Sequence, residues 1–306
     1  MRAVAIINAK AGAVLESGPA IAETIARRFR ERGHDLELSL VSPEDIEEAL
    51  RRAADRSDIE AIIVGGGDGS QSLAASLLAG TGMILGVLPL GTVNLLARDL
   101  EVPLDLLSAV DALAGANVEN IDLGEVNGRT FHSLAGLGFL ARMAQERQRA
   151  RADIPYARWL AFLLALIRAV ARVDRMSLWI ETENGKLLRR SSAVLVTNNI
   201  YRESEWTRPR ISDGLLEVHI VRGWTWLPLV KAGFDMMLGR WRRTGRIESI
   251  LAREIEINPR RRRIPVSIDG EVVQERAPLH FRVQRGALKV LRPVYEPPEA
   301  GRSPAA

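Results

Sequence analysis

Six consecutive residues, Gly65-Gly66-Gly67-Asp68-Gly69-Ser70, combine residue types that bind phosphate groups and metal ions. They follow an apolar, β-branched run that ends at Val64 and precede a helix-like run from Gln71 to Leu78. A strand, a glycine turn and a helix start favour an anion site, because backbone N–H groups can approach phosphate oxygens there and the helix N-terminus carries partial positive charge. Bare phosphate would repel Asp68, so this carboxylate indicates a divalent cation between the two. The alternative is a glycine-rich turn in which Asp68 is only a local cap.

Two other phosphate motifs do not fit this stretch. A Walker motif needs Lys before Ser or Thr at the helix start, and no Lys follows these glycines. The dinucleotide fingerprint needs Gly at its last position, where a frame that starts at Gly65 has Ser70.

A second polar turn, Pro89-Leu90-Gly91-Thr92-Val93-Asn94, follows the apolar run from Met83 to Leu88. The first apolar run of the chain similarly ends in Asn8 to Gly12. On parallel sheets, ligands bind at the carboxyl ends of the strands, which is where these turns and the glycine turn fall. The hydroxyl and amide of the second turn either contact a ligand there or only cap the helix that follows.

Composition narrows the functional class. The 306 residues are 47% hydrophobic and 26% charged, as in an ordinary globular protein large enough for two domains. Cysteine is absent and there are four His, which excludes thiolate sites and argues against zinc. The net charge of +4 comes with clustered arginines that suit a membrane surface or anionic ligands, and no nucleic-acid motif accompanies them.

The chain opens directly on a strand-like run, and its most apolar window, Trp159 to Ile167, is too short to span a bilayer. We therefore expect a cytoplasmic protein that is soluble or peripheral at the membrane.

The first 120 residues alternate strand-like and helix-like runs. Strands are predicted at 4–7, 36–40, 59–64 and 83–88, and helices around 21–29, from Ser42-Pro43 to Ala53, at 71–78 and at 105–114. Strands that alternate with helices predict an α/β domain, a parallel sheet with helices on both faces.

From Asn120 the pattern changes to short β-like runs. Asn127-Gly128 predicts a hairpin turn. One helix is expected at about 156–173, and further runs lie at 177–180, 193–197, 215–221, 254–257, 265–268, 279–283 and 288–291. This pattern predicts a C-terminal antiparallel β-sandwich-like domain at 121–287. Residues 288–306 are expected to return to the N-terminal domain (1–120), with a frayed tail from Pro293.

With both polar turns in place, the chain resembles the diacylglycerol kinase catalytic-domain family, especially its bacterial soluble lipid kinases, related to sphingosine and ceramide kinases. The resemblance runs nearly end to end. Beyond the two turns, it rests on Asp122-Leu123-Gly124, Phe131 to Phe139, Asn198-Asn199, Asp213 to Val218 and Asp269-Gly270-Glu271.

The resemblance implies an ATP-dependent phosphotransferase with an alcohol group as acceptor, acting in phospholipid metabolism. The γ-phosphoryl group of ATP would pass, with Mg²⁺, to a lipid hydroxyl in a cleft between the two domains. The implied nucleotide-binding residues are Asn8, Ser42, Gly66, Gly67, Asp68, Gly69, Ser70, Gln71, Ser72, Gly91, Thr92 and Asn94.

Glu271 falls on the family's base position. Asp68, Asp269 and Asp122 complete the implied catalytic carboxylates. Asp122 either orients the metal or the base, or is a satisfied carboxylate at the end of a strand. Taken without the resemblance, Asp269-Gly270 favours a plain hairpin turn that has Glu271 solvated beside it. A structural Mg²⁺ would bind the Asp213 carboxylate with carbonyl groups near Arg210 and Leu215.

Two departures from the family pattern affect the metal and the substrate. Leu95 stands where many members have an Asp, and Ser70 replaces a Thr but keeps its hydroxyl. The lipid is not specified by the sequence, nor is the nucleotide preference, and a homodimer is an open option.

Two other functions remain open. NAD kinases share the Gly-Gly-Asp-Gly turn, but they have an Asn-Glu pair where this chain has Asn94-Leu95. A non-catalytic lipid-binding protein is a further alternative, against which the retained Asp68 and Glu271 argue.

Three segments mix apolar or aromatic residues with arginines, as interfacial segments do. They are Arg158 to Arg168, Trp224 to Leu227, and Leu238 to Arg243. The pattern of the first favours a core helix over membrane contact, and the arginines of the third are equally consistent with an ordinary solvated surface.

Overall fold

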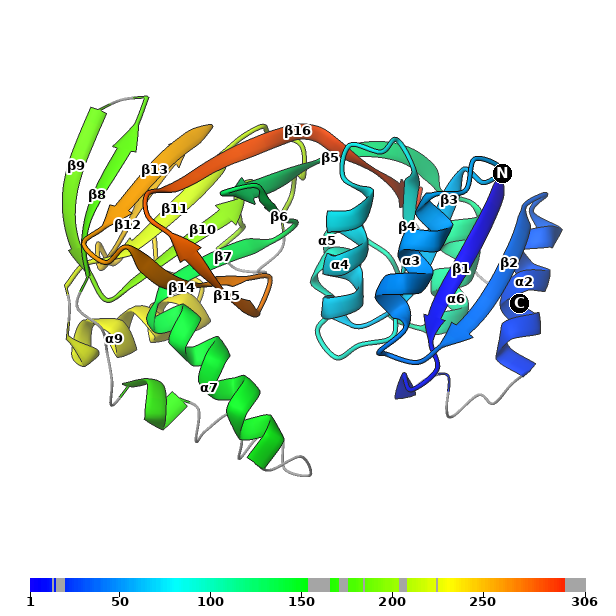
Figure 1. Cartoon of the computed structure of the whole chain (residues 1–306), viewed down its shortest axis with the longest axis horizontal. Coiled ribbons are helices and arrows are strands. Elements are labelled where there is room, and N and C mark those ends of the chain that lie inside the picture. Colours follow the sequence, from blue (N-terminus) through cyan, green and yellow to red (C-terminus); the bar gives the residue numbers. More distant parts are fainter. Residues whose placement is uncertain are drawn as a thin grey trace, which may run out of the picture. The chain divides into compact units, whose positions relative to one another are not determined.

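The computed structural model describes residues 1–12, 14, 20–153, 166–170, 176–183, 185–203, 208–223 and 225–294. The chain forms two compact units (Figure 1). Unit 1 comprises residues 1–119 and 289–306, and unit 2 comprises residues 120–288.

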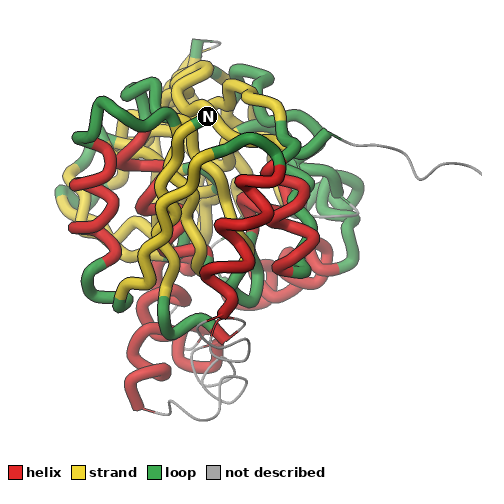
Figure 2. Tube along the Cα trace, turned by 90° about the vertical axis from the view of Figure 1, so that its right-hand side faces the viewer, coloured by secondary structure: helices red, strands yellow, loops and turns green. Residues whose placement is uncertain are grey.

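Unit 1 is built on a parallel sheet with the strand order β2-β1-β3-β4-β16. Its strands are β1 (Arg2–Asn8), β2 (Asp35–Val41), β3 (Ala61–Gly66), β4 (Ile84–Pro89) and the last residues of β16 (Leu279–Arg292). Its helices are α2 (Ala20–Glu31), α3 (Ile46–Ala54), α4 (Asp68–Leu78), α5 (Leu95–Asp99) and α6 (Leu106–Ala114). Figure 2 shows the strands of this unit between helices on both sides. The predicted α/β architecture is confirmed.

The start of one helix in unit 1 differs from the prediction. Ser42-Pro43 was expected to cap α3, but the helix begins at Ile46 with Asp45 as its N-cap residue. Ser42 Oγ donates instead to the Asp45 carboxylate at 2.7 Å, so a short turn separates the strand from the helix. The predicted helix at 105–114 is confirmed, because Asp105 caps α6 by accepting from the backbone N–H of Ser108 at 2.9 Å.

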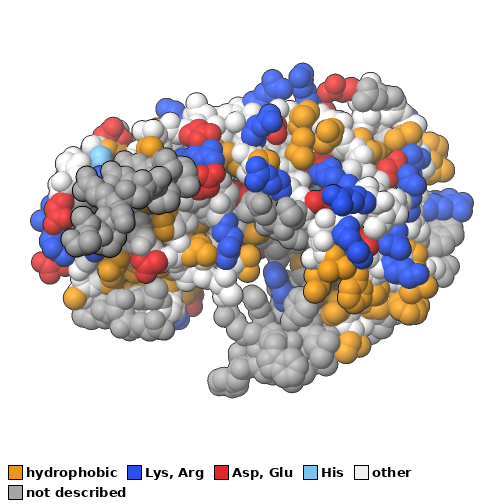
Figure 3. Space-filling model, turned by 180° about the vertical axis from the view of Figure 1, so that it is seen from behind, with side chains coloured by type: hydrophobic (Ala, Val, Ile, Leu, Met, Phe, Trp, Pro, Cys, Tyr) orange, Lys and Arg blue, Asp and Glu red, His pale blue; other side chains and the backbone are white. Residues whose placement is uncertain are grey.

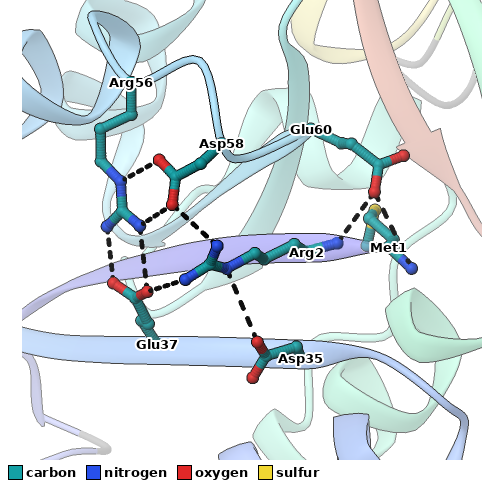
Figure 4. A network of polar contacts seen from close by, with 7 residues as sticks. All are labelled: Met1, Arg2, Asp35, Glu37, Arg56, Asp58 and Glu60. Carbon is teal, nitrogen blue, oxygen red and sulfur yellow. Dashed lines mark hydrogen bonds and ion pairs between the residues drawn. The ribbon is translucent and has the colours of Figure 1, made fainter.

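An ion-pair network joins the amino ends of the strands in unit 1 (Figure 4). Arg2 lies 3.0 Å from Asp58, and Arg56 lies 2.8 Å from Asp58 and 2.6 Å from Glu37. The hydrogen bond from Arg56, ahead of the charges of Arg56 and Arg2, lowers the pKa of Asp58 to about 2. These side chains are largely exposed, so the network ties neighbouring strands together from the outside.

Unit 2 is a two-layer β structure with two helices on one side. One layer is an antiparallel sheet in the order β12-β11-β10-β7-β14-β15. These strands are β12 (Ile247–Ala252), β11 (Leu216–Val221), β10 (Ala193–Asn198), β7 (Leu134–Gly138), β14 (Arg263–Ile268) and β15 (Glu271–Arg276). The other layer contains β5 (Asn117–Val126), β6 (Arg129–Phe131), β8 (Met176–Thr182), β9 (Gly185–Ser191), β13 (Glu254–Pro259) and the rest of β16.

Alternating side chains from both layers form the core of unit 2, which includes Val126, Phe131, Leu178, Val218 and Phe281. Helices α7 (Phe139–Asp153) and α9 (Trp226–Met237) contact the opposite face of the six-stranded sheet. The sandwich-like second domain is thus confirmed. So is the hairpin at Asn127-Gly128, where both residues have positive φ (49° and 85°). The expected helix at 156–173 lies mostly outside the described residues.

Candidate active site

The carboxyl ends of the unit 1 strands bring the predicted nucleotide-binding segments to one edge of the sheet. In the register, Ile7 lies opposite Gly65 and Gly66 lies opposite Pro89. Asn8 pairs with Val41, so Ser42 follows at the same edge. The described part of unit 1 therefore places both polar turns, Asn8 and Ser42 on the side of the sheet where ligands of such folds bind.

The two polar turns approach each other too closely for side chains between them. A Cβ atom on Gly91 would lie 2.5 Å from the Gly67 Cα and 2.7 Å from the Asn94 side chain. A Cβ on Gly66 would lie 2.7 Å from Ser70 Oγ. Backbone atoms cannot give way as a flexible side chain can, so glycine is needed at this crossing. The result is a glycine-lined backbone surface at the start of α4, as phosphate binding requires.

Asp68 connects these two turns through backbone hydrogen bonds. Its carboxylate accepts from the N–H of Leu95 at 2.7 Å and from the N–H of Asn94 at 3.1 Å. Asp68 therefore caps the start of α5, as the local-cap alternative suggested, although the helix is the following one rather than its own. The side chain is half-buried, and each oxygen has a second lone pair.

Asn94 and Gln71 hold the turns from inside. Asn94 has φ of 54°, accepts from the Gly91 N–H at 2.9 Å and donates to the Gly91 carbonyl at 2.9 Å. Gln71 is fully buried and donates to the Gly66 carbonyl at 3.1 Å. Both side chains thus position the loops, whereas Gly69 and Thr92 are exposed and Ser70 and Ser72 are half-buried.

Asn8 and Ser42 have local hydrogen bonds at the same edge. Asn8 Oδ1 accepts from the N–H of Lys10 at 2.9 Å, and Ser42 donates to Asp45. Both residues are half-buried, and contact with a nucleotide stays a prediction for them.

In unit 2, Asp122 is a buried connector between loops. It is 2% exposed and accepts from the N–H of Gly214 at 2.6 Å and from the N–H of Gly286 at 2.9 Å. Because both carboxylate oxygens bond to backbone groups that are distant in sequence, this residue fixes loop positions. Of the two roles left open for Asp122, the geometry favours the satisfied strand-end carboxylate.

The Asp269-Gly270 turn is the hairpin between β14 and β15, with positive φ at both residues (46° and 92°). The Asp269 side chain is 3% exposed and accepts from the N–H groups of His132, Ser133 and Leu134 at 2.9 to 3.0 Å. These contacts fasten the turn to the start of β7. Asp269 is thereby placed to hold this turn in position.

Glu271 directly follows this turn, and its surroundings differ from those of Asp269. Its side chain is exposed and has no hydrogen bond or ion pair with any residue that the structure describes. A carboxylate on a fixed turn, with its oxygens available, has the properties that a proton acceptor needs.

Beside this turn, an apolar cavity of about 360 Å³ lies between the six-stranded sheet and the helices α7 and α9. Gly270 lines it, together with residues from both helices and the sheet, among them Leu140, Met143, Leu195, Val221 and Met236. The cavity has room for an apolar ligand beside the turn that precedes Glu271. The sequence analysis did not predict this cavity. A signal was present, because five of the lining residues recur at helical spacing along α7: Phe139, Leu140, Met143, Ala144 and Arg147.

Arg147 and Ser267 are polar residues of the lining, and so is His219. It is 4% exposed, its Nδ1 lies 2.9 Å from Ser249 Oγ, and its Nε2 lies 3.5 Å from Glu217. Burial lowers the pKa of His219, and the nearby Glu217 only partly offsets this effect. The imidazole is therefore neutral at neutral pH, in keeping with the apolar lining.

The expected structural Mg²⁺ site consists of Asp213 and the carbonyl groups around it. A guanidinium nitrogen of Arg210 lies 3.5 Å from the Asp213 carboxylate, and the Leu215 carbonyl accepts from the N–H of Asn199 at 2.9 Å. A positive side chain thus already accompanies the one carboxylate. Among the described residues, no cluster of three or more acidic or histidine side chains could hold a metal ion. This second metal site stays a prediction.

The segments that were expected at a membrane surface have different outcomes. Trp241 is 1% exposed, and Arg242 binds the buried Glu217, so neither is available at an interface. Trp226 is 56% exposed. Trp159 and Trp224 lie outside the described residues. No helix in the described part of the chain is long and apolar enough to cross a bilayer.

Comparison with known proteins identifies the family. Residues 2–126 match the diacylglycerol kinase catalytic domain, and residues 134–292 match the YegS C-terminal NAD kinase beta sandwich-like domain. A diacylglycerol kinase of Staphylococcus saprophyticus is 32% identical over 114 residues, which cover 36% of this chain and 37% of that protein. A protein of Klebsiella pneumoniae named probable lipid kinase YegS-like is 41% identical over 105 residues, 33% of each chain. These alignments therefore span about a third of the length of the two curated relatives.

A solved structure extends the likeness over the whole fold. The crystal structure of a diacylglycerol kinase from Bacillus anthracis has a TM-score of 0.68 at 17% identity and covers 97% of both chains. The two domain models match consecutive parts of the chain, and the shared fold covers both parts. Together these findings assign the family. The chain belongs to the bacterial lipid kinase and diacylglycerol kinase family, in which a diacylglycerol kinase catalytic domain precedes a YegS C-terminal domain.

Proposed function

We propose that this protein transfers the γ-phosphoryl group of ATP to the hydroxyl group of a lipid, diacylglycerol or a related lipid. The observation that carries the proposal is the apolar cavity whose lining includes Gly270, the neighbour of the exposed Glu271. A polar acceptor such as a dinucleotide has no use for a cavity lined almost entirely by apolar side chains.

The nucleotide is assigned to the carboxyl edge of the unit 1 sheet. Backbone N–H groups of the glycine turn, at the start of α4, would bind the phosphates. The half-buried Asp68 suits Mg²⁺, which in such sites takes one or two carboxylates along with substrate phosphates and water. The chemistry supplied by Mg²⁺ is neutralisation of phosphate charge.

In unit 2, Glu271 accepts the proton of the lipid hydroxyl. As the proton leaves, the lipid oxygen forms a bond to the γ-phosphorus, and the bond from that phosphorus to the β-γ bridging oxygen breaks, which releases ADP. Asp269 keeps the turn that carries Glu271 fixed to β7, and Asp122 fixes the loops at Gly214 and Gly286. Neither of these two carboxylates needs to lose or gain a proton.

The test is Glu271→Gln, assayed with labelled ATP and mixed micelles of single lipids, with NAD as a polar acceptor in the same panel. General-base catalysis contributes about 10²–10⁴-fold, so kcat should fall by that factor with little change in ATP affinity. Glu254→Gln removes another exposed carboxylate of unit 2 and should leave kcat unchanged. Turnover of NAD but of no lipid would replace the proposed function with a dinucleotide kinase activity.

A further inference from the structure

Helix α9 has apolar side chains on two faces, and only one of them is covered. Leu229 and Ala232 are buried and, with Met236, line the cavity. The other face has Phe234 60% exposed and Met237 76% exposed. Trp226, Leu227 and Leu238, at the two ends of the helix, are also about half exposed.

A helix that only roofs a cavity would normally have polar side chains on its outer face. Here the exposed residues at positions 226, 227, 234, 237 and 238 follow helical spacing and form one patch, which we call the α9 face. Contiguous exposed apolar patches mark surfaces that contact a membrane or another protein. In Figure 3, hydrophobic side chains gather with Lys and Arg side chains beside them at the lower right, where α9 lies.

Charge at the α9 face favours an anionic lipid surface. Lys231, Arg240 and Arg243 are exposed on the helix and just beyond its end. Lys231 and Arg243 have no ion-pair partner among the described residues. Asp235, the acidic residue of the helix, is 4% exposed and pairs with Arg246 at 2.6 Å, so it adds no free negative charge at this surface. Apolar side chains with Trp and a collar of cations are the signature of a helix that lies in a membrane interface.

The cavity reaches the surface beside the α9 face. Gly233 lines the cavity and is exposed, and a Cβ atom there would meet no atom within 4 Å. Gly233 directly precedes Phe234, so a path between the exposed face of the helix and the cavity would pass this glycine. A protein partner would have no use for such a path, whereas a lipid leaving a bilayer needs it.

We propose that the α9 face docks this protein onto anionic membranes and that the lipid substrate enters the cavity past Gly233. The docking surface is formed by Trp226, Leu227, Phe234, Met237 and Leu238, with Lys231, Arg240 and Arg243 contacting lipid headgroups. The route into the cavity rests on the proposed function, while the docking itself does not.

Docking is tested by vesicle sedimentation, which requires no turnover. The Phe234→Gln, Met237→Gln double variant should bind phosphatidylcholine–phosphatidylglycerol vesicles at least about tenfold more weakly than the wild type, because two large apolar side chains no longer leave water. Trp179→Gln with Leu188→Gln is the matched control. These side chains are 47% and 48% exposed on the β8–β9 hairpin, and this pair of changes should leave binding unaltered.

The electrostatic contribution to vesicle binding is tested with Lys231→Gln and Arg243→Gln. Each should weaken binding about fivefold on anionic vesicles at low salt, and little on vesicles of phosphatidylcholine alone. Arg260→Gln and Arg261→Gln, in an exposed basic loop, are the controls. Vesicle binding that is indifferent to the α9 variants overturns the proposal. Loss of self-association with unchanged vesicle binding also overturns it, by assigning the face to a second copy.

Activity assays separate docking from the reaction. The Phe234→Gln, Met237→Gln variant should lose turnover of lipid in vesicles but keep the turnover of a short-chain, monomeric lipid alcohol. If the wild type phosphorylates no lipid yet binds vesicles through the α9 face, the proposed function fails and the docking surface stands. If turnover is lost equally on both substrates, the variant has damaged the site, and entry past the α9 face is rejected.

Discussion

The two ends of the parallel sheet in unit 1 use charged residues in opposite ways. At the amino ends of the strands, Arg2, Glu37, Arg56 and Asp58 pair with one another through exposed side chains (Figure 4). At the carboxyl ends, the partners of Asp68 among the described residues are backbone N–H groups, and Asp68 stands among glycines. Charged side chains that pair with each other attract a charged ligand only weakly. A carboxylate that is held by neutral backbone groups keeps its negative charge, so the carboxyl edge is suited to chemistry and the amino edge to stability.

The largest expected effect comes from Asp68→Asn at the carboxyl edge. Turnover should fall by about 10²-fold or more, as when a preorganised group that stabilises transition-state charge is lost. The hydrogen bond that an amide cannot accept should cost only about 1 kcal/mol of folding stability. The assay is Mg²⁺-dependent phosphorylation of lipid, with thermal unfolding measured in parallel. Asp58→Asn, the same change at the amino edge, should leave turnover intact, and equal losses in the two variants would erase the contrast.

Gly91→Ala should damage stability and nucleotide binding together. The new Cβ would meet the Gly67 Cα at 2.5 Å, and two backbone segments must separate to admit it, at a cost of about 1–3 kcal/mol. Urea unfolding and ATP titration measure the two effects. Gly69→Ala is the matched control for the unfolding measurement, because nothing lies within 4 Å of its Cβ position and its φ is not positive. In α4 this change should stabilise the fold by about 0.5–1 kcal/mol. A Gly91→Ala variant as stable as the wild type would show that the turns have room to separate.

The sequence analysis was most successful where the signal is local. A few neighbouring residues suffice to predict these elements. Examples are the apolar runs that end in Gly66 or Pro89 and the turn at Asn127-Gly128. The α/β domain and the sandwich follow from such runs alone. Helices α7 and α9 were missed. The apolar start of α7 at Phe139 follows strand β7 without a break, and α9 has Pro228 in its first turn, where proline is tolerated in a helix.

The roles of the carboxylates could not be predicted from local patterns. Asp269 meets the backbone of His132 to Leu134, which is more than 130 residues away in sequence, and Asp122 meets Gly214 and Gly286. Only the folded chain shows that Asp122 and Asp269 accept hydrogen bonds from the backbone, whereas the Glu271 side chain has no partner among the described residues. The cavity could not be predicted locally either, because its lining comes from two helices and five strands that are far apart in the sequence.

A smaller effect is expected from Arg56→Ala at the amino edge. Arg56 contacts both Glu37 and Asp58, but these are surface pairs, whose contribution is small and screened by salt. Melting temperature should fall slightly at low ionic strength and match the wild type at high ionic strength, with turnover unchanged at both. A loss of turnover would mean that the two edges are coupled, although no hydrogen bond in the described part of unit 1 links them.

The smallest effect is a pH dependence that belongs to the amino edge. The pKa of Asp58 is lowered from 3.8 to about 2 by Arg56. Because the folded-state pKa lies below the unfolded one, the Asp58 carboxylate stabilises the fold fully above its unfolded pKa, and the contribution disappears as the pH falls toward the folded value. The difference in unfolding free energy between the wild type and Asp58→Asn should therefore be constant from neutral pH down to about pH 5 and shrink from there toward pH 2. Urea unfolding of both proteins across this range measures it. Turnover measured near neutral pH lies above this window, so the amino edge should not affect the pH profile of turnover there. A difference that grew on acidification would require Asp58 to be protonated in the native state, and the pairing with Arg56 would then be absent.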